Sequence, residues 1–357
     1  MTPKINMTRF AGQKLLVAPL DWGLGHATRC IPIIKALLNQ NCKIWLAGEG
    51  AQEVLLRKEF PELPFLPLEG YRVGYSASRM TGKILLQVPK IINAIKTENR
   101  WLKEKVKELG FNAVISDNRY GLCHENIPCI FITHQLYIKT GLGKWSEWLL
   151  QNQNYKLINC FSECWVPDEE GENNLAGELS HPGKMPAVPV KYIGPLSRFV
   201  RMDSYGEKRG IIETKNHLLI LLSGPEPQRT IFEKKIFGDL KNVENSVTVV
   251  RGLPQEKETP VVNERVTVFN HLASYELQKE IEKAEWVIGR CGYSTVMDLA
   301  ALQKKSILVP TPGQAEQEYL AKHLMKNKIA FCVSQKEFSL EETLKQANQF
   351  MYLSTAQ

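Results

Sequence analysis

The sequence lacks the features that mark several common classes of protein. No apolar run reaches the roughly 18–20 residues that a membrane-spanning helix needs. Residues 1–10 are polar and charged and hold no apolar signal segment, so we expect a protein that starts and stays on the cytoplasmic side. The eight cysteines include no C-x-x-C pair, so we expect neither a zinc site nor a redox dithiol.

Two further absences concern ligands. No loop carries a convincing D-x-D pair, so we expect no essential metal. The net charge is +7, yet no basic stripe with interleaved aromatic residues appears, and we do not expect a nucleic-acid partner. A moderate positive charge instead suits anionic substrates or an anionic membrane surface.

The length of 357 residues favours two domains over one core. Apolar runs typical of buried strands alternate with segments of helical period in both halves, which predicts an α/β protein. Trp145, Trp148, Leu149 and Leu150 share one face of a predicted helix. We expect that face to lie in the core or at an interface.

The most informative stretch covers residues 286–319. It predicts a buried strand at 286–288, a turn bracketed by Gly289 and Gly292, a helix capped by Ser294, a strand at 306–309 and a helix from 316 to 325. Polar groups fall at the strand C-terminal ends and helix N-terminal ends, where open α/β sheets bind ligands. They are Arg290, Ser294, Thr295, Glu316 and Gln317.

Backbone N–H groups at these helix ends favour anions, and the carboxylate of Asp298 can accept hydrogen bonds from a ribose diol. Plainer interpretations remain open. Asp298 suits the start of a helix because of the helix dipole, and Arg290 could be an ordinary surface charge.

The run G-R-C-G-Y-S-T-V-M-D, followed by V-P-T-P-G-Q-A-E-Q-E-Y, resembles the nucleotide-sugar signature of GT-B glycosyltransferases, and family 28 matches best. The family pattern is R-[AS]-G-x-x-T-[VL]-x-E and then P-x-x-x-x-x-x-Q-Q-Y. The resemblance implies that Arg290 lies near the donor diphosphate or base and that Asp298 replaces the ribose-binding Glu. Gln317 and Glu318 replace a Gln pair near the donor sugar, and the change to Glu318 leaves the sugar open.

The first Gly-rich turn, D-W-G-L-G-H-A-T-R at 21–29, lies between a strand at 14–20 and a helix from about 27 to 38. Gly23, Gly25 and the later Glu49 approach a dinucleotide fingerprint. The turn also resembles the G-x-G-G-H loop of family 28, which faces the acceptor. A close-packed turn capped by His26 is a third interpretation. We hypothesise that His26 is a general base or orients the acceptor, since its ordinary pKa suits proton transfer near neutrality.

Two more predicted strands, at 113–117 and 129–133, end in polar residues. Asp117 ends the first and is the rival general base, although capping of the next turn explains it equally well. His134 and Gln135 follow the second and resemble part of the H-E-Q-N motif of family 28, which implies a place on the acceptor side.

Residues 72–107 predict a basic amphipathic helix, with nine Lys/Arg against two Glu between Tyr71 and Lys107. A core-facing helix with a solvated face explains the pattern as well. The resemblance implies instead contact with an anionic bilayer and a lipid-linked acceptor, which replacement of Lys83, Lys90 and Lys96 by Glu would test in vesicle sedimentation.

Arg198 follows a predicted strand that resembles the family's segment before the interdomain linker, so it is expected to approach the nucleotide. Ser223 and Gly224 begin a loop that corresponds to the family's phosphate loop, where Glu226 and two prolines depart from the pattern. Asn270 takes the position that borders the nucleobase in family 28, so the resemblance implies a place beside the base.

The resemblance implies the GT-B fold, with two Rossmann-like domains facing each other across a cleft. We expect the acceptor-side domain at 1–197, the nucleotide-sugar domain at 198–338 and, at 339–357, a final helix that crosses back to the N-terminal domain. No cofactor is expected beyond the donor substrate.

The leading hypothesis is an inverting transferase that moves a hexose or N-acetylhexosamine from a UDP-sugar to a hydroxyl, which the resemblance suggests is lipid-linked. The protein would then be cytoplasmic and peripheral at the inner face of the membrane. Alternatives are a non-catalytic UDP-sugar or lipid-binding subunit, a UDP-sugar epimerase and an NAD(P)-dependent oxidoreductase.

Overall fold

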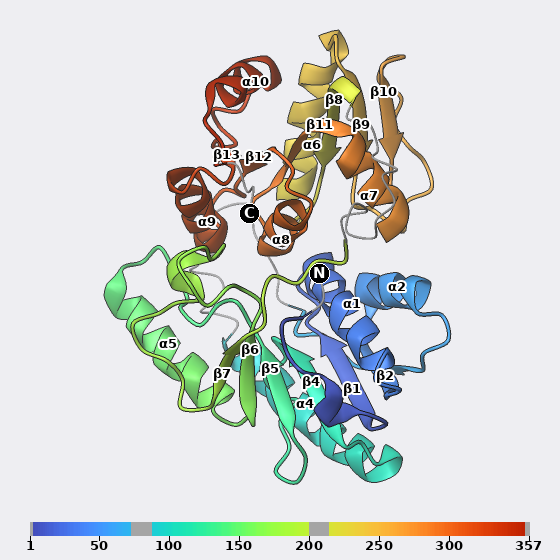
Figure 1. The fold of residues 1–357 in the computed structure, drawn as a ribbon, viewed down its shortest axis with the longest axis vertical. Helices are drawn as coiled ribbons and strands as arrows, with labels where there is room; N and C mark the ends of the chain where they lie inside the picture. The colour runs from blue at the N-terminus through green and yellow to red at the C-terminus, as the bar shows by residue number, and fades with distance from the viewer. Residues whose placement is uncertain (1–2, 73–87, 200–213, 354–357) are drawn as a thin grey trace. The chain divides into compact units, whose positions relative to one another are not determined.

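The computed structural model describes residues 3–72, 88–199 and 214–353. They form two compact units, a first unit that ends at Arg198 and a second unit that begins at Phe199. Each unit is one parallel sheet with helices packed on it (Figure 1). The predicted α/β class is therefore confirmed. None of the described helices is both long and apolar enough to cross a membrane.

The first unit is a sheet of seven parallel strands in the order β3-β2-β1-β4-β5-β6-β7. The strands are β1 (Lys14–Pro19), β2 (Lys43–Gly48), β3 (Phe65–Pro67), β4 (Ala113–Asp117), β5 (Cys129–Ile132), β6 (Glu163–Val166) and β7 (Val190–Tyr192). The helices are α1 (Leu24–Leu38), α2 (Gly50–Glu59), α4 (Val88–Leu109) and α5 (Lys144–Ile158), with short 3-10 turns at Thr8–Phe10 and Gly177–Leu179. Strand order reverses between β1 and β4, which is where ligands bind in open α/β sheets.

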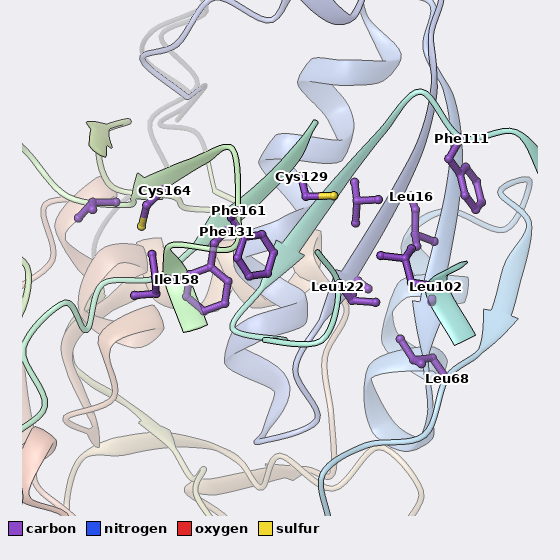
Figure 2. Packing of buried hydrophobic residues seen from close by; sticks show 14 of the residues in the cluster. Leu16, Leu68, Leu102, Phe111, Leu122, Cys129, Phe131, Ile158, Phe161 and Cys164 are labelled. Atoms are coloured by element: carbon purple, nitrogen blue, oxygen red, sulfur yellow. The ribbon is translucent and has the colours of Figure 1, made fainter. Parts of the chain in front are cut away.

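The strands of the first unit are apolar along their length because helices cover both faces of a parallel sheet. On one face Leu16 of β1 and Phe131 of β5 pack in a cluster with Leu102 of α4 and Ile158 of α5 (Figure 2). Burying a side chain of this size stabilises the fold by about 1.5–3 kcal/mol, so this layer holds the strand ends in register.

The second unit is a sheet of six parallel strands in the order β10-β9-β8-β11-β12-β13. The strands are β8 (Thr214–Leu221), β9 (Ser246–Val250), β10 (Val266–Phe269), β11 (Ala284–Arg290), β12 (Ser306–Val309) and β13 (Phe331–Cys332). The helices are α6 (Gln228–Asp239), α7 (Ser274–Lys283), α8 (Tyr293–Ala301), α9 (Ala315–Lys326) and α10 (Leu340–Gln349), with a 3-10 turn at Leu240–Asn242. Here the strand order reverses between β8 and β11.

The last helix packs on the core of the second unit. Leu340 and Ala347 of α10 are buried in the same core cluster as Phe232 of α6. The amide of Leu340 also donates to the Asp239 carboxylate at 3.0 Å, which fixes the helix start to the end of α6.

Two predictions change in part. The aromatic face of α5 was expected in the core or at an interface, and the exposed fractions of Trp145 and Trp148, 75% and 59%, exclude only the core. Helix α1 starts at Leu24 rather than near Ala27, because Gly23 adopts φ 101° and turns the chain directly from β1 into the helix. The predicted basic helix is α4 from Val88 onward, and Lys83 lies outside the described residues.

Candidate functional site

The first unit gathers its polar candidates at the ends of three adjacent strands. Asp117 is the last residue of β4, His134 follows β5, and His26 lies in the first turn of α1, just after β1. His26 Nδ1 lies 3.1 Å from Asp117 Oδ1. The structure thus brings together the two residues that the sequence offered as rival bases.

At the centre of this cluster is Arg29, which sequence reasoning missed. Its Nε donates to Asp117 Oδ2 at 2.6 Å, and its Nη2 donates to Asp117 Oδ1. The same guanidinium contacts His134 Nδ1 at 3.1 Å and His26 Nδ1 at 2.8 Å. The available signal was spacing, because residues three apart on a helix are neighbours and Arg29 follows His26 by three.

Burial separates the members of the cluster. Asp117 is fully buried and Arg29 is 2% exposed, whereas the side chain of His26 is 14% exposed. Of His26 and Asp117, only His26 therefore presents an atom to solvent. A group that exchanges a proton with a bound molecule must be within hydrogen-bond reach of it, and this favours His26.

The charges of the cluster follow from the same geometry. Burial alone would raise the pKa of Asp117, but the Arg29 guanidinium and His26 outweigh it and hold that pKa at about 2. Burial, reinforced by the nearby Arg29 charge, lowers the pKa of His26 despite the opposing pull of Asp117. Near neutral pH the cluster therefore holds an ionised carboxylate, a guanidinium and a neutral imidazole.

The other first-unit candidates have mainly structural contacts. The carbonyl of Gly25 accepts from Thr28 Oγ1 at 3.0 Å, and that of Gln135 accepts from Asn154 Nδ2 at 3.4 Å. Glu49, the ribose candidate of the dinucleotide interpretation, accepts from the Arg72 guanidinium at 2.9 and 3.1 Å. Its carboxylate is thus paired with a cation, which leaves it poorly placed to receive a ribose diol.

The second unit gathers its candidates at the equivalent edge of its sheet. Arg290 ends β11 and is 1% exposed. Its Nη2 donates to the Gln228 carbonyl at 2.9 Å and to Gln335 Oε1 at 2.6 Å, and its Nη1 donates to the carbonyls of residues 309 and 310. The guanidinium also lies 4.2 Å from the centroid of the Phe232 ring.

Arg290 differs from an ordinary buried arginine in its lack of an anion. Among the described residues no carboxylate forms an ion pair with it, and its buried Nε donates to no acceptor. Burial lowers the pKa of Arg290 to about 10. A buried cation held only by neutral oxygens is costly, and a bound anion would compensate it.

Thr311, just after β12, is a second orphan at the same edge. Its hydroxyl is fully buried and has no hydrogen-bond partner in the described part of the chain. The loop between β8 and α6 approaches Thr311 at Gly224. The φ of Gly224 is 102°, and an added Cβ would lie 3.8 Å from Thr311 Oγ1. Both orphan polar atoms therefore belong to the strand ends beside the β8–β11 reversal.

The two residues predicted to lie near the sugar each accept a hydrogen bond from a backbone amide. Gln317 Oε1 accepts from the Thr311 amide at 2.9 Å, and Glu318 Oε1 accepts from the Gly313 amide at 2.9 Å. Gln317 is 8% exposed. These side chains shape the loop between β12 and α9, and Glu316 begins that helix beside them.

In the proline-containing loop that begins at Ser223, the acidic residue Glu226 forms an ion pair within the loop and the start of α6. Glu226 Oε1 accepts from Arg229 Nε at 2.6 Å, so its negative charge is paired rather than left beside Ser223 and Gly224. Asn270 is also occupied, because its Oδ1 accepts from Arg251 at 2.8 Å and its Nδ2 donates to the carbonyls of Glu256 and Glu258.

Four of the remaining donor candidates belong to α8 or its N-cap. Gly292 is the N-cap residue of the helix, and Ser294 and Thr295 lie in its first turn. Asp298 lies one turn further in than predicted and is 9% exposed. Arg198 is the last residue of the first unit. Across the described ranges, no group of three or more His, Cys, Asp or Glu side chains is arranged to hold a metal ion.

Comparison with known proteins indicates the class to which this chain belongs. Residues 232–354 match the sequence model of the glycosyltransferase family 28 C-terminal domain. A Methanosarcina acetivorans protein described as an uncharacterized glycosyltransferase is 22% identical over 319 residues, which cover 85% of this chain and 81% of that protein.

Two solved structures share the fold at low identity. LpCGTa, in complex with UDP, gives a TM-score of 0.61 at 12% identity and covers 97% of this chain and 92% of its own. MurG of Acinetobacter baumannii gives a TM-score of 0.53 at 15% identity, with coverage of 95% and 90%.

The two parallel α/β units and the solved structures define a GT-B fold. The family model and the Methanosarcina relative identify the chain as a glycosyltransferase. Residues 232–354 match the family 28 C-terminal domain, and the predicted resemblance to that family is confirmed.

Proposed function

We propose that the protein transfers a hexose or N-acetylhexosamine from a UDP-sugar to a hydroxyl group with inversion at the anomeric carbon. The observation that carries the donor half is Arg290, a buried cation without a carboxylate partner in the described part of the family 28 domain. A diphosphate supplies the missing negative charge. The solved neighbour LpCGTa, which holds UDP, supports this donor class.

In the second unit, different strand ends and helix starts would then bind different parts of the donor. Arg290, the Thr311 hydroxyl and the N-terminal N–H groups of α8 suit the diphosphate, where negative charge grows as the sugar leaves. The Asp298 carboxylate suits the ribose hydroxyls. The proposed reaction needs no metal, because these cationic and dipolar groups stabilise the leaving group.

In the first unit His26 is the proposed base. As the acceptor oxygen bonds to the anomeric carbon, its proton passes to the imidazole, and the bond to the UDP oxygen breaks on the opposite face of the sugar. Asp117 is poorly suited to this role because it is fully buried and Arg29 holds both carboxylate oxygens. The negative Asp117 nonetheless favours the protonated His26 that the step creates.

A lipid-linked acceptor at an anionic membrane surface is the finer part of the proposal. It is supported by Trp145 and Trp148, which α5 exposes beside the exposed Lys144, and by the exposed Ile92 and Lys90 of α4. Tryptophan and lysine together favour the membrane–water interface. The net charge of +7 would strengthen attraction to anionic lipids.

Vesicle sedimentation tests this membrane contact. Trp145→Ala with Trp148→Ala should release the protein from vesicles that contain anionic lipid, whereas Tyr275→Ala removes an exposed aromatic of the second unit and should not. Equal sedimentation of wild type and the double variant would refute contact through α5.

Calorimetric titration tests the donor half. UDP should bind the wild type, and Asp298→Ala should weaken that binding about 10-fold, the loss expected when hydrogen bonds to a charged group are removed. UMP and NAD are controls. The absence of UDP binding at millimolar ligand would reject the donor site, and preferred binding of NAD would favour an oxidoreductase.

A product assay tests the transfer itself. Turnover of a UDP-sugar with a hydroxyl acceptor should give a product of inverted configuration, and EDTA should leave the rate unchanged. UDP binding without any turnover would favour a non-catalytic subunit, whereas sugar interconversion without acceptor would indicate an epimerase.

A further inference from the structure

One atom of the first-unit cluster has two incompatible neighbours. His26 Nδ1 lies 3.1 Å from Asp117 Oδ1, which can only accept a hydrogen bond, and 2.8 Å from Arg29 Nη2, which can only donate one. A neutral imidazole carries a proton on one nitrogen. If Nδ1 carries it, His26 donates to Asp117 and Nε2 is a free base; if Nδ1 accepts from Arg29, Nε2 carries the proton instead.

The partners of Asp117 indicate which arrangement prevails. Arg29 donates from Nε to one carboxylate oxygen and from Nη2 to the other, so Asp117 already receives a forked, charge-assisted pair. The contact from Arg29 to His26 Nδ1 is also shorter than that from Asp117. His134 Nδ1 faces Arg29 Nη1 at 3.1 Å and must likewise accept.

We propose that Arg29 is a positioning residue that decides which nitrogen of His26 carries the proton and holds the free protein in the Nε2–H tautomer. In that form His26 offers a hydrogen-bond donor at Nε2. It becomes a base at Nε2 when its proton sits on Nδ1 and is donated to Asp117, which requires Arg29 to give up its contact with Nδ1.

This role rests on the proposed function in one respect, since it matters for transfer only if His26 is the base. Three groups act on the imidazole: Arg29 from α1, Asp117 from β4 and His134 after β5. The Cys30 thiol lies 3.7 Å from Asp117 and faces the carboxylate. Of the two cationic or potentially cationic neighbours, Arg29 has the larger effect, and it lowers the pKa of His26.

Nuclear magnetic resonance of ¹⁵N-labelled protein tests the proposal without any substrate. Long-range ¹H–¹⁵N correlations report which ring nitrogen is protonated. In the wild type near neutral pH, His26 should show the Nε2–H pattern. A wild-type Nδ1–H pattern would overturn the proposal without recourse to any variant.

Arg29→Lys is the informative variant, because the compact ammonium still neutralises Asp117 but cannot supply the planar fork. His26 should change to the Nδ1–H tautomer, and its pKa should rise toward or above the ordinary value of about 6.5. Arg29→Gln removes the charge and should shift both observables further. An unchanged tautomer and pKa in both folded variants would overturn the proposal.

Arg119→Lys is the matched control. Arg119 is fully buried in the same unit and pairs with the Glu98 carboxylate, yet it does not contact His26. Its replacement should cost comparable stability and leave the His26 signals in place. A shift of equal size in this control would assign the effect to general loosening of the unit.

The pH dependence of transfer separates this inference from the proposed function. In Arg29→Lys the acid limb of kcat/KM should move to higher pH by the same amount as the His26 pKa. If no UDP-sugar is turned over but the tautomer changes in the Arg29 variants, the proposed function is rejected and the positioning role of Arg29 is kept. If transfer proceeds and its acid limb is the same in wild type and Arg29→Lys, the positioning role is rejected and the proposed function is kept.

Discussion

Both units place a buried arginine where their strand order reverses, but they surround it differently. Arg29 in the first unit is paired with the Asp117 carboxylate, whereas Arg290 in the second unit is held by carbonyl and amide oxygens. An internally balanced cluster can hold a neutral imidazole steady for proton transfer. An unbalanced cation is suited to an external anion, and the same architecture thus serves two kinds of chemistry.

The largest expected effect comes from unbalancing the first unit. Asp117→Ala leaves Arg29 buried without its anion, so the free energy of unfolding should fall by about 3–5 kcal/mol. Urea denaturation measures this. Adding Arg29→Met to Asp117→Ala should restore much of the loss, and a double variant no more stable than the single one would contradict the pairing.

The next effect concerns chemistry rather than stability. His26→Ala should lower the rate of transfer by about 10²–10⁴-fold, the usual contribution of a positioned base. UDP affinity, measured by calorimetry, should stay unchanged because donor binding is assigned to the second unit. A matching loss of UDP affinity would show that the division between the units is wrong.

Replacement of Arg290 should weaken donor binding and leave the stability of the protein nearly unchanged. Arg290→Met should weaken UDP binding by about 10–100-fold, since hydrogen bonds to charged groups contribute about 1.5–3 kcal/mol. The apo protein should lose little stability, because the variant also removes a buried charge. Severe unfolding with residual UDP affinity near that of wild type would mean that Arg290 is purely structural.

The smallest predicted effect is a pH dependence of stability. The pKa of Asp117 is held at about 2, below its ordinary value of 3.8, so the folded state binds this proton less readily than the unfolded state. The stabilisation is complete above about pH 4 and is lost as the pH falls toward 2, by about 2 kcal/mol in total.

The lowered pKa of His26 acts in the same direction at higher pH. The unfolded chain takes up a proton near pH 6.5, whereas folded His26 resists it, so stability falls as the pH drops below about 6.5. Denaturation midpoints across pH 2–8 measure both steps. His26→Gln should shrink the upper step only, because burial also lowers the pKa of His217, which adds to that step. A midpoint that is flat from pH 7 to 5 would contradict the buried neutral imidazole.

The sequence predicted the strands well because parallel sheets covered on both faces need continuous apolar runs. It also predicted that His26, Asp117 and His134 lie at strand ends, and the structure brings them together. Arg29 was missed because an arginine in an early turn of a helix looks like a solvated residue, and only the tertiary position of Asp117 makes it a buried partner.

Another expectation changed in part for an equally local reason. The tryptophans of α5 form an amphipathic face, and periodicity alone cannot say whether such a face meets the core or the solvent. Glu318 stays a predicted sugar contact, and its carboxylate also accepts from the amide of Gly313.

Gly23 has a consequence for mutational scanning. Its φ of 101° and ψ of 163° lie in a region almost exclusive to glycine and cost an L-residue about 1–3 kcal/mol, yet an added Cβ would meet no atom within 4 Å. Gly23→Ala should therefore leave a folded protein, with α1 starting later and His26 displaced from Asp117. A scan scored by protein abundance would pass this position as nearly tolerant, whereas one scored by product would report it as essential.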